Sequence, residues 1–456
     1  MKKMTANRIT VLFAILFFIL SCKKKEEVNL NDPNTNGETG ESVMITDETV
    51  ELSGKMHGVM KSGKTYKLVG DLYIEKDREI LMESGVRLES TAGGVEANES
   101  YSIFVYGSFV SLGTEANPNW ITTTSEKRTK ENFLKGYVGT IEARETAKEL
   151  IFKWTHLEYL GGPSGPGSAL YDEGETMKGI RTLTEDVKLI VEDSWFFGST
   201  DDAIRPDGGK ISILRNTFEA VGGVEGEGVN VKGGTVGSIA YNVFIGGATN
   251  GPKTANSGGK PTQANVDIYN NTILTSGFRR VAAGRGGSIN IESGARGKIY
   301  NNLIVNCRFG TRVVSGTDYA NTFIDYNWYF GNGTYEGIVF ADEFYPTAGV
   351  IPEEYPFPAN DFTSNEDPMF VSYNVNQFSD TDYTMADQLS IMPYNMNMVG
   401  TQNLRLATGS PCINAGYTGF TPVNVISQTG VRGANVTPPS ADLGAYPTNG
   451  TGNRHN

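Results

Sequence analysis

Short segments of the chain alternate apolar and polar residues, and glycine or asparagine separates one segment from the next. In residues 266–273, for example, Val266 and Ile268 lie on one face of the expected strand, and Asp267 and Tyr269 lie on the opposite face. A period of two is typical of a β-strand. Residues 66–124 contain several more short segments of this kind. The pattern predicts a chain built from many short strands.

One asparagine returns at nearly regular intervals through the middle of the chain. The intervals are 26, 29, 31 and 25 residues in the series Asn216, Asn242, Asn271, Asn302 and Asn327. A repeat of this length is expected of a solenoid whose units stack and bury one continuous core. The uneven spacing favours strands over helices, because stacked strands keep their register while the turns between them lengthen.

The repeated asparagine phrase resembles the right-handed parallel β-helix proteins, whose asparagines lie at one corner of every rung and hydrogen-bond along the stack. Residues 66–124 are similar to the capped first rungs of that fold. Three later segments are similar to its closing rungs and C-terminal cap: 365–370, 404–416 and 442–447. The resemblance implies an all-β, right-handed parallel β-helix from about Thr65 to Tyr446, with an N-terminal cap and an irregular C-terminal cap.

The N-terminus has the pattern of a secretory signal peptide. Basic residues precede twelve residues, 9–20, of which only Thr10 is not apolar. This run is too short to span a bilayer comfortably. The following Ser21-Cys22 resembles a bacterial lipobox, which implies that Cys22 is lipidated, and the Lys-Lys-Lys-Glu-Glu run of residues 23–27 resembles a tag for the outer face of the outer membrane. Ordinary secretion with a chance cysteine is the alternative.

These patterns predict the domain boundaries. Residues 26–48 are polar and cannot repay the entropy of ordering, so they are expected to act as a flexible tether. The expected order is a signal peptide (1–21), a tether (22–48), a single β-helix domain (49–446) whose C-terminal cap region begins near 331, and a tail (447–456).

The 55 glycines among 456 residues are explained by the turns that such a solenoid needs. Only three cysteines occur, so no disulfide framework is expected. Cys307 and Cys412 could pair only if the C-terminal segment folds back, and we expect them to be free.

Charge is unevenly distributed along the chain. The formal net charge is −13, yet residues 251–312 hold nine cations and two anions, a local net of +7. The cations are Lys253, Lys260, Arg279, Arg280, Arg285, Arg296, Lys298, Arg308 and Arg312. A focused positive band attracts anionic ligands, and an acidic polysaccharide or an acidic envelope partner fits a surface lipoprotein better than nucleic acid. The alternative is that these cations pair with carboxylates from neighbouring rungs.

Two segments, 199–207 and 225–234, hold the densest ionisable clusters. In the second, alternation predicts that Val229 and Val231 face the core while Asn230 and Lys232 face outward. The same rule turns Arg205 outward. Arg205 precedes Lys232 by 27 residues, about one rung, so the two cations are expected on adjacent strands about 4.8 Å apart. Such proximity lowers the pKa of a lysine and favours its use as a base.

The cluster resembles the calcium-dependent polysaccharide lyases built on the β-helix. Glu225, Glu227 and Lys232 reproduce their Glu-x-Glu-x4-Lys spacing, and the Asp201-Asp202 pair is similar to a calcium-binding rung of the pectate-type branch. The resemblance implies that these four carboxylates hold calcium and that Lys232 removes a proton, with Arg205 beside it. Two departures weaken the resemblance. Arg205 stands where the pectate-type branch has another aspartate. The alginate-type branch has an arginine in the rung after the lysine, whereas here no arginine follows Lys232 before Arg279.

Two functions are therefore open. The first is an outer-membrane, surface-exposed lipoprotein that binds an acidic polysaccharide or an envelope partner without catalysis. Its expected ligand contacts are Lys253, Arg279, Arg280, Arg285 and Asn230. The second is a calcium-dependent lyase in which Lys232 takes the C5 proton of a uronate. The two departures favour the binding protein.

Overall fold

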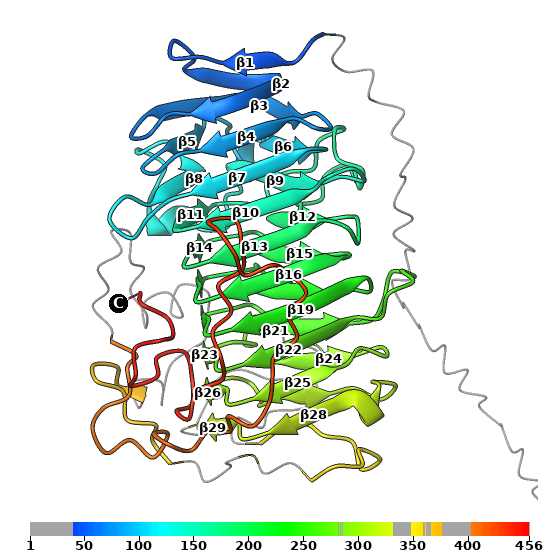
Figure 1. Cartoon of the computed structure of the whole chain (residues 1–456), viewed down its shortest axis with the longest axis vertical. Coiled ribbons are helices and arrows are strands. Elements are labelled where there is room, and N and C mark those ends of the chain that lie inside the picture. Colours follow the sequence, from blue (N-terminus) through cyan, green and yellow to red (C-terminus); the bar gives the residue numbers. More distant parts are fainter. Residues whose placement is uncertain are drawn as a thin grey trace, which may run out of the picture.

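The computed structural model describes residues 40–280, 282, 284, 286–331, 348–358, 361, 366–375 and 403–455. Over these ranges the chain is a right-handed parallel β-helix of 29 strands, which confirms the predicted fold class (Figure 1). Three 3-10 helices occur in turns: η1 (Val95–Ala97), η2 (Lys130–Asn132) and η3 (Tyr319–Asn321). None of these helices could cross a membrane. The predicted signal peptide, including Cys22, lies outside the described residues.

The strands form three parallel stacks along the molecule. The first stack contains β4 (Glu79–Met82), β7 (Ser108–Leu112), β10 (Glu149–Lys153), β13 (Lys188–Glu192), β16 (Gly209–Leu214), β19 (Thr235–Ala240), β22 (Asn265–Tyr269), β25 (Gly297–Tyr300) and β28 (Thr322–Asp325). The second contains β5 (Arg87–Ser90), β8 (Asn119–Thr123), β11 (Thr155–Glu158), β14 (Trp195–Phe197), β17 (Thr217–Glu219), β20 (Val243–Ile245), β23 (Thr272–Leu274), β26 (Leu303–Val305) and β29 (Trp328–Phe330). The third contains β6 (Tyr101–Val105), β9 (Val138–Ala143), β12 (Ile180–Thr182), β15 (Ile204–Pro206), β18 (Val229–Val231), β21 (Pro252–Ala255), β24 (Asn290–Glu292) and β27 (Arg312–Val313).

Each rung of the solenoid uses three strands, one from each stack. Every strand in a stack pairs in parallel with the strand three elements later, as β13 does with β16 and β16 with β19. Alternate side chains point inward and form one continuous core. In the second stack the rings of Phe196, Phe218 and Phe244 lie above one another, with centroids 4.5 and 4.7 Å apart and nearly parallel planes. Period-two alternation therefore predicted both the strands and the buried face.

The repeated asparagines form a buried ladder at the corner between the first and second stacks. The Nδ2 of Asn242 donates to Oδ1 of Asn271 at 3.0 Å, and the Nδ2 of Asn271 donates to Oδ1 of Asn302 at 2.9 Å. Each Oδ1 also accepts the backbone N–H of the preceding asparagine in the ladder. The residue before each asparagine is in the left-handed conformation: Arg215, Tyr241, Asn270, Asn301 and Tyr326. The corner turn thus explains the repeated phrase.

The ladder extends beyond the asparagines that the sequence shows. Toward the N-terminus Oδ1 of Asn216 accepts the backbone N–H of Ser194, whose Oγ accepts that of Thr155 at 3.1 Å. At the other end Nδ2 of Asn327 donates to Asp361 at 2.9 Å. A search for asparagine misses Ser194 because its hydroxyl oxygen fulfils the same acceptor role.

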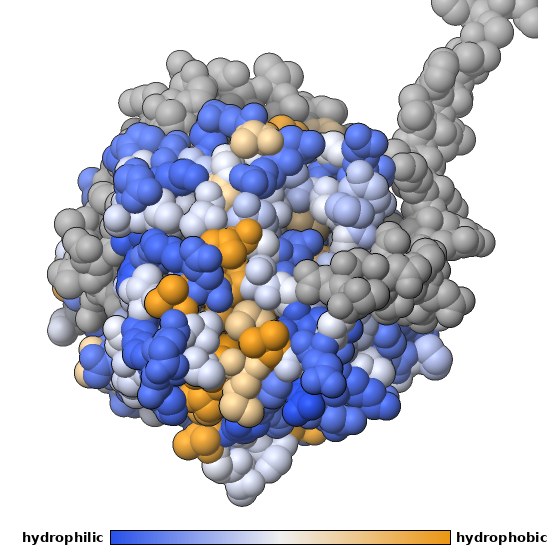
Figure 2. Space-filling model, turned by 90° about the horizontal axis from the view of Figure 1, so that it is seen from above, coloured by the Kyte–Doolittle hydropathy of each residue, from blue (hydrophilic) through white to orange (hydrophobic). Residues whose placement is uncertain are grey.

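The solenoid begins earlier than predicted. β1 (Val43–Ile45) lies inside the segment that we expected to be a tether, and it pairs in parallel with β2 (Glu51–Met60). β2 and β3 (Thr65–Ile74) are long enough to bend across two stacks each. The terminal rung leaves Val43, Met44 and Val50 58–61% exposed. Figure 2 shows apolar patches on this end of the molecule.

The C-terminal region does not continue the rungs. Residues 348–358 close the last rung, where the backbone N–H of Val313 donates to the carbonyl of Val350 at 2.9 Å and the hydroxyl of Tyr355 donates to the carbonyl of Thr322. Residues 403–455, which we call the C-terminal segment, then run back along the outside of the first and second stacks (Figure 1). Arg432 forms a bidentate ion pair with Glu79 at 2.6 and 2.8 Å, eight rungs away from the last strand of the first stack.

The end of the chain is packed rather than hanging free as a tail. His455 is buried and stacks on Trp195 with ring centroids 3.6 Å apart, while its Nδ1 lies 2.9 Å from Oγ1 of Thr217. Cys307 and Cys412 are both buried and free, as expected, although the C-terminal segment does fold back. The predicted boundary at 446 therefore does not mark the end of the folded domain.

Replacing Asn271 with leucine is expected to lower the free energy of unfolding by about 3 kcal/mol or more, because each buried group left without a partner costs about 1–3 kcal/mol. The change removes the acceptor for two donors of Asn242 and the donor to Asn302. Urea unfolding followed by circular dichroism measures the effect. Asn449→Leu, at an exposed position, is the control. Equal stability of the two variants would show that the ladder does not hold the rungs.

Candidate functional site

The candidate site lies on the outer face of the third stack. Near β9 this face is covered by the 163–176 loop, where Oγ of Ser168 lies 3.1 Å from Glu142 and Arg144 donates to the carbonyl of Gly167. Further along, Arg205, Lys232 and Arg312 keep partial exposure. The predicted cluster therefore occupies the part of the third stack from β12 to β27.

The predicted side-chain directions on this face are correct, but one predicted neighbour is not. Val229 and Val231 are fully buried in the core, and Asn230 faces outward in register with Lys253. Ile204 pairs with Val229, so this rung is 25 residues long rather than 27. Arg205 therefore stands opposite Asn230, and Lys232 comes two positions later along the strand direction. The shorter rung is the physical reason for the error.

Most charged groups of this face are paired with a neighbour of opposite charge. Arg181 and Arg205 both contact Asp207, at 2.6 and 3.3 Å. Lys178 pairs with Asp201. In later rungs Arg280 contacts Glu225 at 2.7 Å, and Lys253 lies 3.1 Å from Glu292 and 3.9 Å from Glu227.

The four carboxylates proposed as calcium ligands do not converge on one point. Asp201 and Glu225 are bound by different cations, and Asp202 accepts hydrogen bonds from Asn230 Nδ2 and from the backbone of Glu227, both at 2.8 Å. Within the described ranges no group of three or more histidine, cysteine or acidic side chains is placed to hold a metal ion. Calcium prefers six to eight oxygen ligands, so the residues present do not fit it.

Asp202 and Glu227 form a carboxylate–carboxylic acid pair in adjacent rungs. Burial and the charge of Asp202 raise the pKa of Glu227 to about 8, so Glu227 is mostly protonated at neutral pH. Burial opposes ionisation of Asp202, but the hydrogen bond from Glu227 and the charges of Lys178 and Arg205 outweigh it and hold the pKa of Asp202 below its ordinary value. The amide of Asn230 bridges the two groups, at 2.8 and 3.1 Å.

Lys232 differs from its neighbours because its ammonium group has no hydrogen-bond or ion-pair partner among the described residues. Burial, followed by the positive charges of Arg205 and Lys253, lowers the pKa of Lys232. Arg205 thus acts on Lys232 electrostatically, as predicted, although the two residues are not in register. A half-buried lysine with a lowered pKa is suited to proton transfer.

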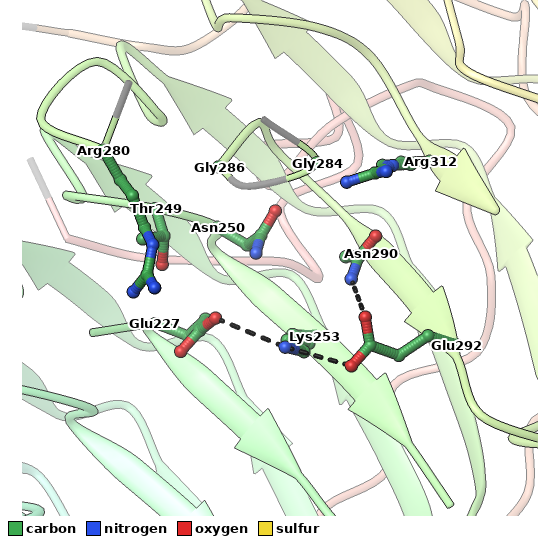
Figure 3. A pocket seen from close by; sticks show the side chains of 10 residues that line it. All are labelled: Glu227, Thr249, Asn250, Lys253, Arg280, Gly284, Gly286, Asn290, Glu292 and Arg312. Carbon is green, nitrogen blue, oxygen red and sulfur yellow. Dashed lines mark hydrogen bonds and ion pairs between the residues drawn. The ribbon is translucent and has the colours of Figure 1, made fainter. Parts of the chain in front are cut away.

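A shallow pocket on the same face begins at Glu227, in the rung of Lys232, and continues over the next three rungs, with a volume of about 20 Å³. Figure 3 shows its lining side chains. They are Glu227, Thr249, Asn250, Lys253, Arg280, Gly284, Gly286, Asn290, Glu292 and Arg312. Asn290 and Arg312 are in register with Lys253, one and two rungs on. The pocket therefore gathers the outward positions of successive rungs.

Arg312, Asn250 and Asn290 are among the pocket residues that were not predicted from the sequence as ligand contacts. The guanidinium of Arg312 has no hydrogen-bond or ion-pair partner in the described part of the chain and lies over the ring of Phe309, 5.9 Å from its centroid. Asn250 and Asn290 are 3% and 5% exposed, and the Oδ1 atom of each lacks a donor. Asparagine is common in this chain, so these positions could have been identified as neighbours only from the register of the rungs.

Several cations of the predicted positive band have structural roles instead. Arg279 donates to the carbonyl oxygens of residues 221–223 and of Gly246, at 2.7–3.1 Å, so it holds turns together rather than facing a ligand. Arg308 is fully buried and donates to the carbonyl of Arg280 at 2.6 Å. Lys298 pairs with Asp267 at 3.1 Å. Arg285 lies outside the described residues. Pairing across rungs, the alternative left open above, accounts for much of this band.

Comparison with protein-family models, with curated proteins and with solved structures finds no significant match to this chain. The class of the protein is therefore defined by its own fold and site, a parallel β-helix with an open charged face. The resemblance to polysaccharide lyases rests on the residues of the segments 199–207 and 225–234 alone.

The pKa of Lys232 is expected to lie below the ordinary value of a lysine side chain. The ¹³C signals of reductively methylated lysines, followed by NMR across alkaline pH, measure it. In Arg205→Gln the pKa of Lys232 should rise, because removal of a neighbouring cation favours the protonated form. The electrostatic account fails if Lys232 has the ordinary pKa of a lysine or if the Arg205 change leaves its pKa where it was.

Proposed function

We propose that this protein binds an acidic polysaccharide on the outer face of its third stack, between β15 and β27. The observation that carries the proposal is the pair of cations, Lys232 and Arg312, whose side chains lack an anionic partner among the described residues. Arg312 lines the pocket, and Lys232 lies in the rung of Glu227, where the pocket begins. Protonation of Glu227 removes one negative charge from this face at neutral pH. An anion placed there completes the pairing that the other cations of the face already have.

The shape and charge of the molecule support a glycan over other anionic partners. The location at the cell surface that the N-terminal sequence suggests favours a glycan over nucleic acid, and the acidic remainder of the chain confines any polyanion to this face. A protein partner would need a broad contact surface, whereas the unpaired groups line one small pocket and the rung beside it. A polysaccharide can lie along this face and place single charged groups at such a pocket while its remainder stays in solvent.

The N-terminal sequence supports a location for this binding. The lipobox-like Ser21-Cys22 and the charged residues 23–27 indicate a lipid-anchored protein at the outer membrane, facing the cell exterior. Protease added to intact cells should then digest the protein, and Cys22→Ser should move it from the membrane fraction to the soluble one. Complete protection until the cells are lysed would place the protein inside the envelope instead.

Binding to acidic polysaccharides is expected to weaken with salt, because exposed charge contacts are screened within about 8–10 Å at 0.1–0.15 M ionic strength. Alginate, polygalacturonate and a glycosaminoglycan, with neutral dextran for comparison, can be titrated with the purified protein at several salt concentrations. Arg312→Ala should lower the affinity roughly tenfold, the size of one charge-assisted hydrogen bond. Arg78→Ala, which removes an exposed arginine before β4, is the charge-matched control. Absence of binding to every acidic polymer would refute the proposal.

A lyase is the second candidate, and the lowered pKa of Lys232 is the observation that favours it. In that reaction Lys232 would accept the C5 proton of a uronate, the glycosidic C4–O bond would break, and a C4–C5 double bond would form. The same polymers can be followed by the ultraviolet absorbance of unsaturated uronates, with and without added calcium. An absorbance signal that Lys232→Ala abolishes would establish the lyase. Binding without absorbance would exclude it for those polymers.

A further inference from the structure

Lys232 and Arg312, whose side chains lack an anionic partner among the described residues, lie three rungs apart on the third stack. The register partners that link their rungs are, in order, Asn230, Lys253, Asn290 and Arg312. Three steps of about 4.8 Å separate the first of these positions from the last by about 14 Å along the solenoid axis. Lys232 follows Asn230 by two positions, about 7 Å along the strand direction. The Cα atoms of the two cations are therefore about 16 Å apart.

Each of these cations is suited to an anionic ligand, but the two cannot share one carboxylate. Arg312 is partly exposed, and its Nε atom is buried without a hydrogen-bond partner. Lys232 is also partly exposed, and an anion beside it favours the protonated form that burial and the charges of Arg205 and Lys253 disfavour. Outward side chains stand roughly perpendicular to their sheet, so the two charged ends are about as far apart as the Cα atoms.

The charged groups between the two cations balance one another. Lys253 lies 3.1 Å from Glu292 and 3.9 Å from Glu227 (Figure 3). Glu227 is mostly protonated at neutral pH, so Lys253 and Glu292 form a pair without net charge. Arg280 beside them is paired with Glu225 at 2.7 Å. The two cations therefore lie at the ends of a nearly neutral span, and a ligand with an anionic group at each end of that span matches them.

The charged face has a limit at each end. Toward the N-terminus the 163–176 loop covers Glu142, the register partner of Arg181. Beyond Arg312 the next register position is the apolar Val350. Six rungs, from β12 to β27, lie between these limits, and their five steps span about 24 Å. A linear ligand that lies along the solenoid axis therefore has room for a short segment only.

We infer that this face binds a segment of acidic glycan that runs along the solenoid axis and bridges Lys232 and Arg312 with two of its anionic groups. The inference rests on the proposed function and specifies it, because it sets the orientation and the minimum length of the glycan segment. A single sugar acid reaches one cation only. A segment that reaches both makes the second contact within the same complex, which raises the affinity without a second association. Segments longer than the face gain little more.

Isothermal titration of the purified full chain with two series of oligosaccharides of defined length tests this inference. Oligogalacturonates carry an acid on every residue, and hyaluronan oligosaccharides carry one on every second residue. We expect the affinity to rise about tenfold, the size of one charge-assisted hydrogen bond, at the length that first spans the two cations. In both series the rise should come at the same end-to-end length, although the number of charges differs.

Substitutions of the two cations test whether the rise comes from bridging. Lys232→Ala and Arg312→Ala should each abolish it, so that long and short oligosaccharides bind alike. Lys232→Arg should retain the rise, because it keeps a cation at that position. Lys210→Ala and Arg78→Ala, which remove exposed cations elsewhere, are the controls and should change nothing. Circular dichroism and thermal unfolding confirm that each variant is folded.

The outcomes separate this inference from the proposed function. An affinity that grows steadily with the number of charges, or a rise that survives either alanine variant, would overturn the inference and leave the proposed function standing. A rise at one end-to-end length in both series, lost in both alanine variants, would support it. Absence of binding at every length and by the parent polymers would count against the proposed function itself, and the inference would fall with it.

Discussion

The hydrogen bond from one ladder asparagine to the next is the interaction on which the arrangement of this molecule depends. Many strands of the second and third stacks are only three residues long, so each contributes few backbone bonds to its neighbours. The buried amides add bonds that run along the solenoid axis at one corner of successive rungs. Because the ladder fixes which residues lie above one another, it also decides which outward side chains meet on the third stack. The pocket is a consequence of that register.

The fold could be predicted because its signal is repeated. Period-two alternation and a returning asparagine each occur many times, so a single departure, such as serine in place of asparagine at position 194, does not hide the pattern. The candidate site was harder to predict, because a site is formed once. The directions of Asn230 and Lys232 followed from alternation, but the pairing of Arg205 required the length of one particular rung. To predict that Arg312 belongs to the same site, the lengths of three successive rungs would have been needed.

Charge counting along the sequence found the region but not the groups that matter. The nine cations in residues 251–312 suggested an open positive band. Arg279 and Arg308, however, donate hydrogen bonds to carbonyl oxygens within turns. Parallel stacking places cations of one rung beside carboxylates of the next, so local sequence charge overestimates the charge available to a ligand. The charge that remains available to a ligand comes from cations without a carboxylate partner in the next rung, such as Lys232 and Arg312. These cations can be identified only once the rungs are aligned.

Folding of the first rungs is completed only after the C-terminal segment has been synthesised. In a simple repeat protein each unit contacts only its neighbours, so early units can finish folding as they emerge. Here Arg432 binds Glu79 across 353 residues, and Ile426 and Ala434 cover Val110, Ile151 and Ile190 on the first stack. At about 5–20 residues per second of synthesis, roughly 20–70 s separate those partners. An incomplete chain therefore leaves these three side chains uncovered throughout that interval, and a prematurely terminated chain leaves them uncovered permanently.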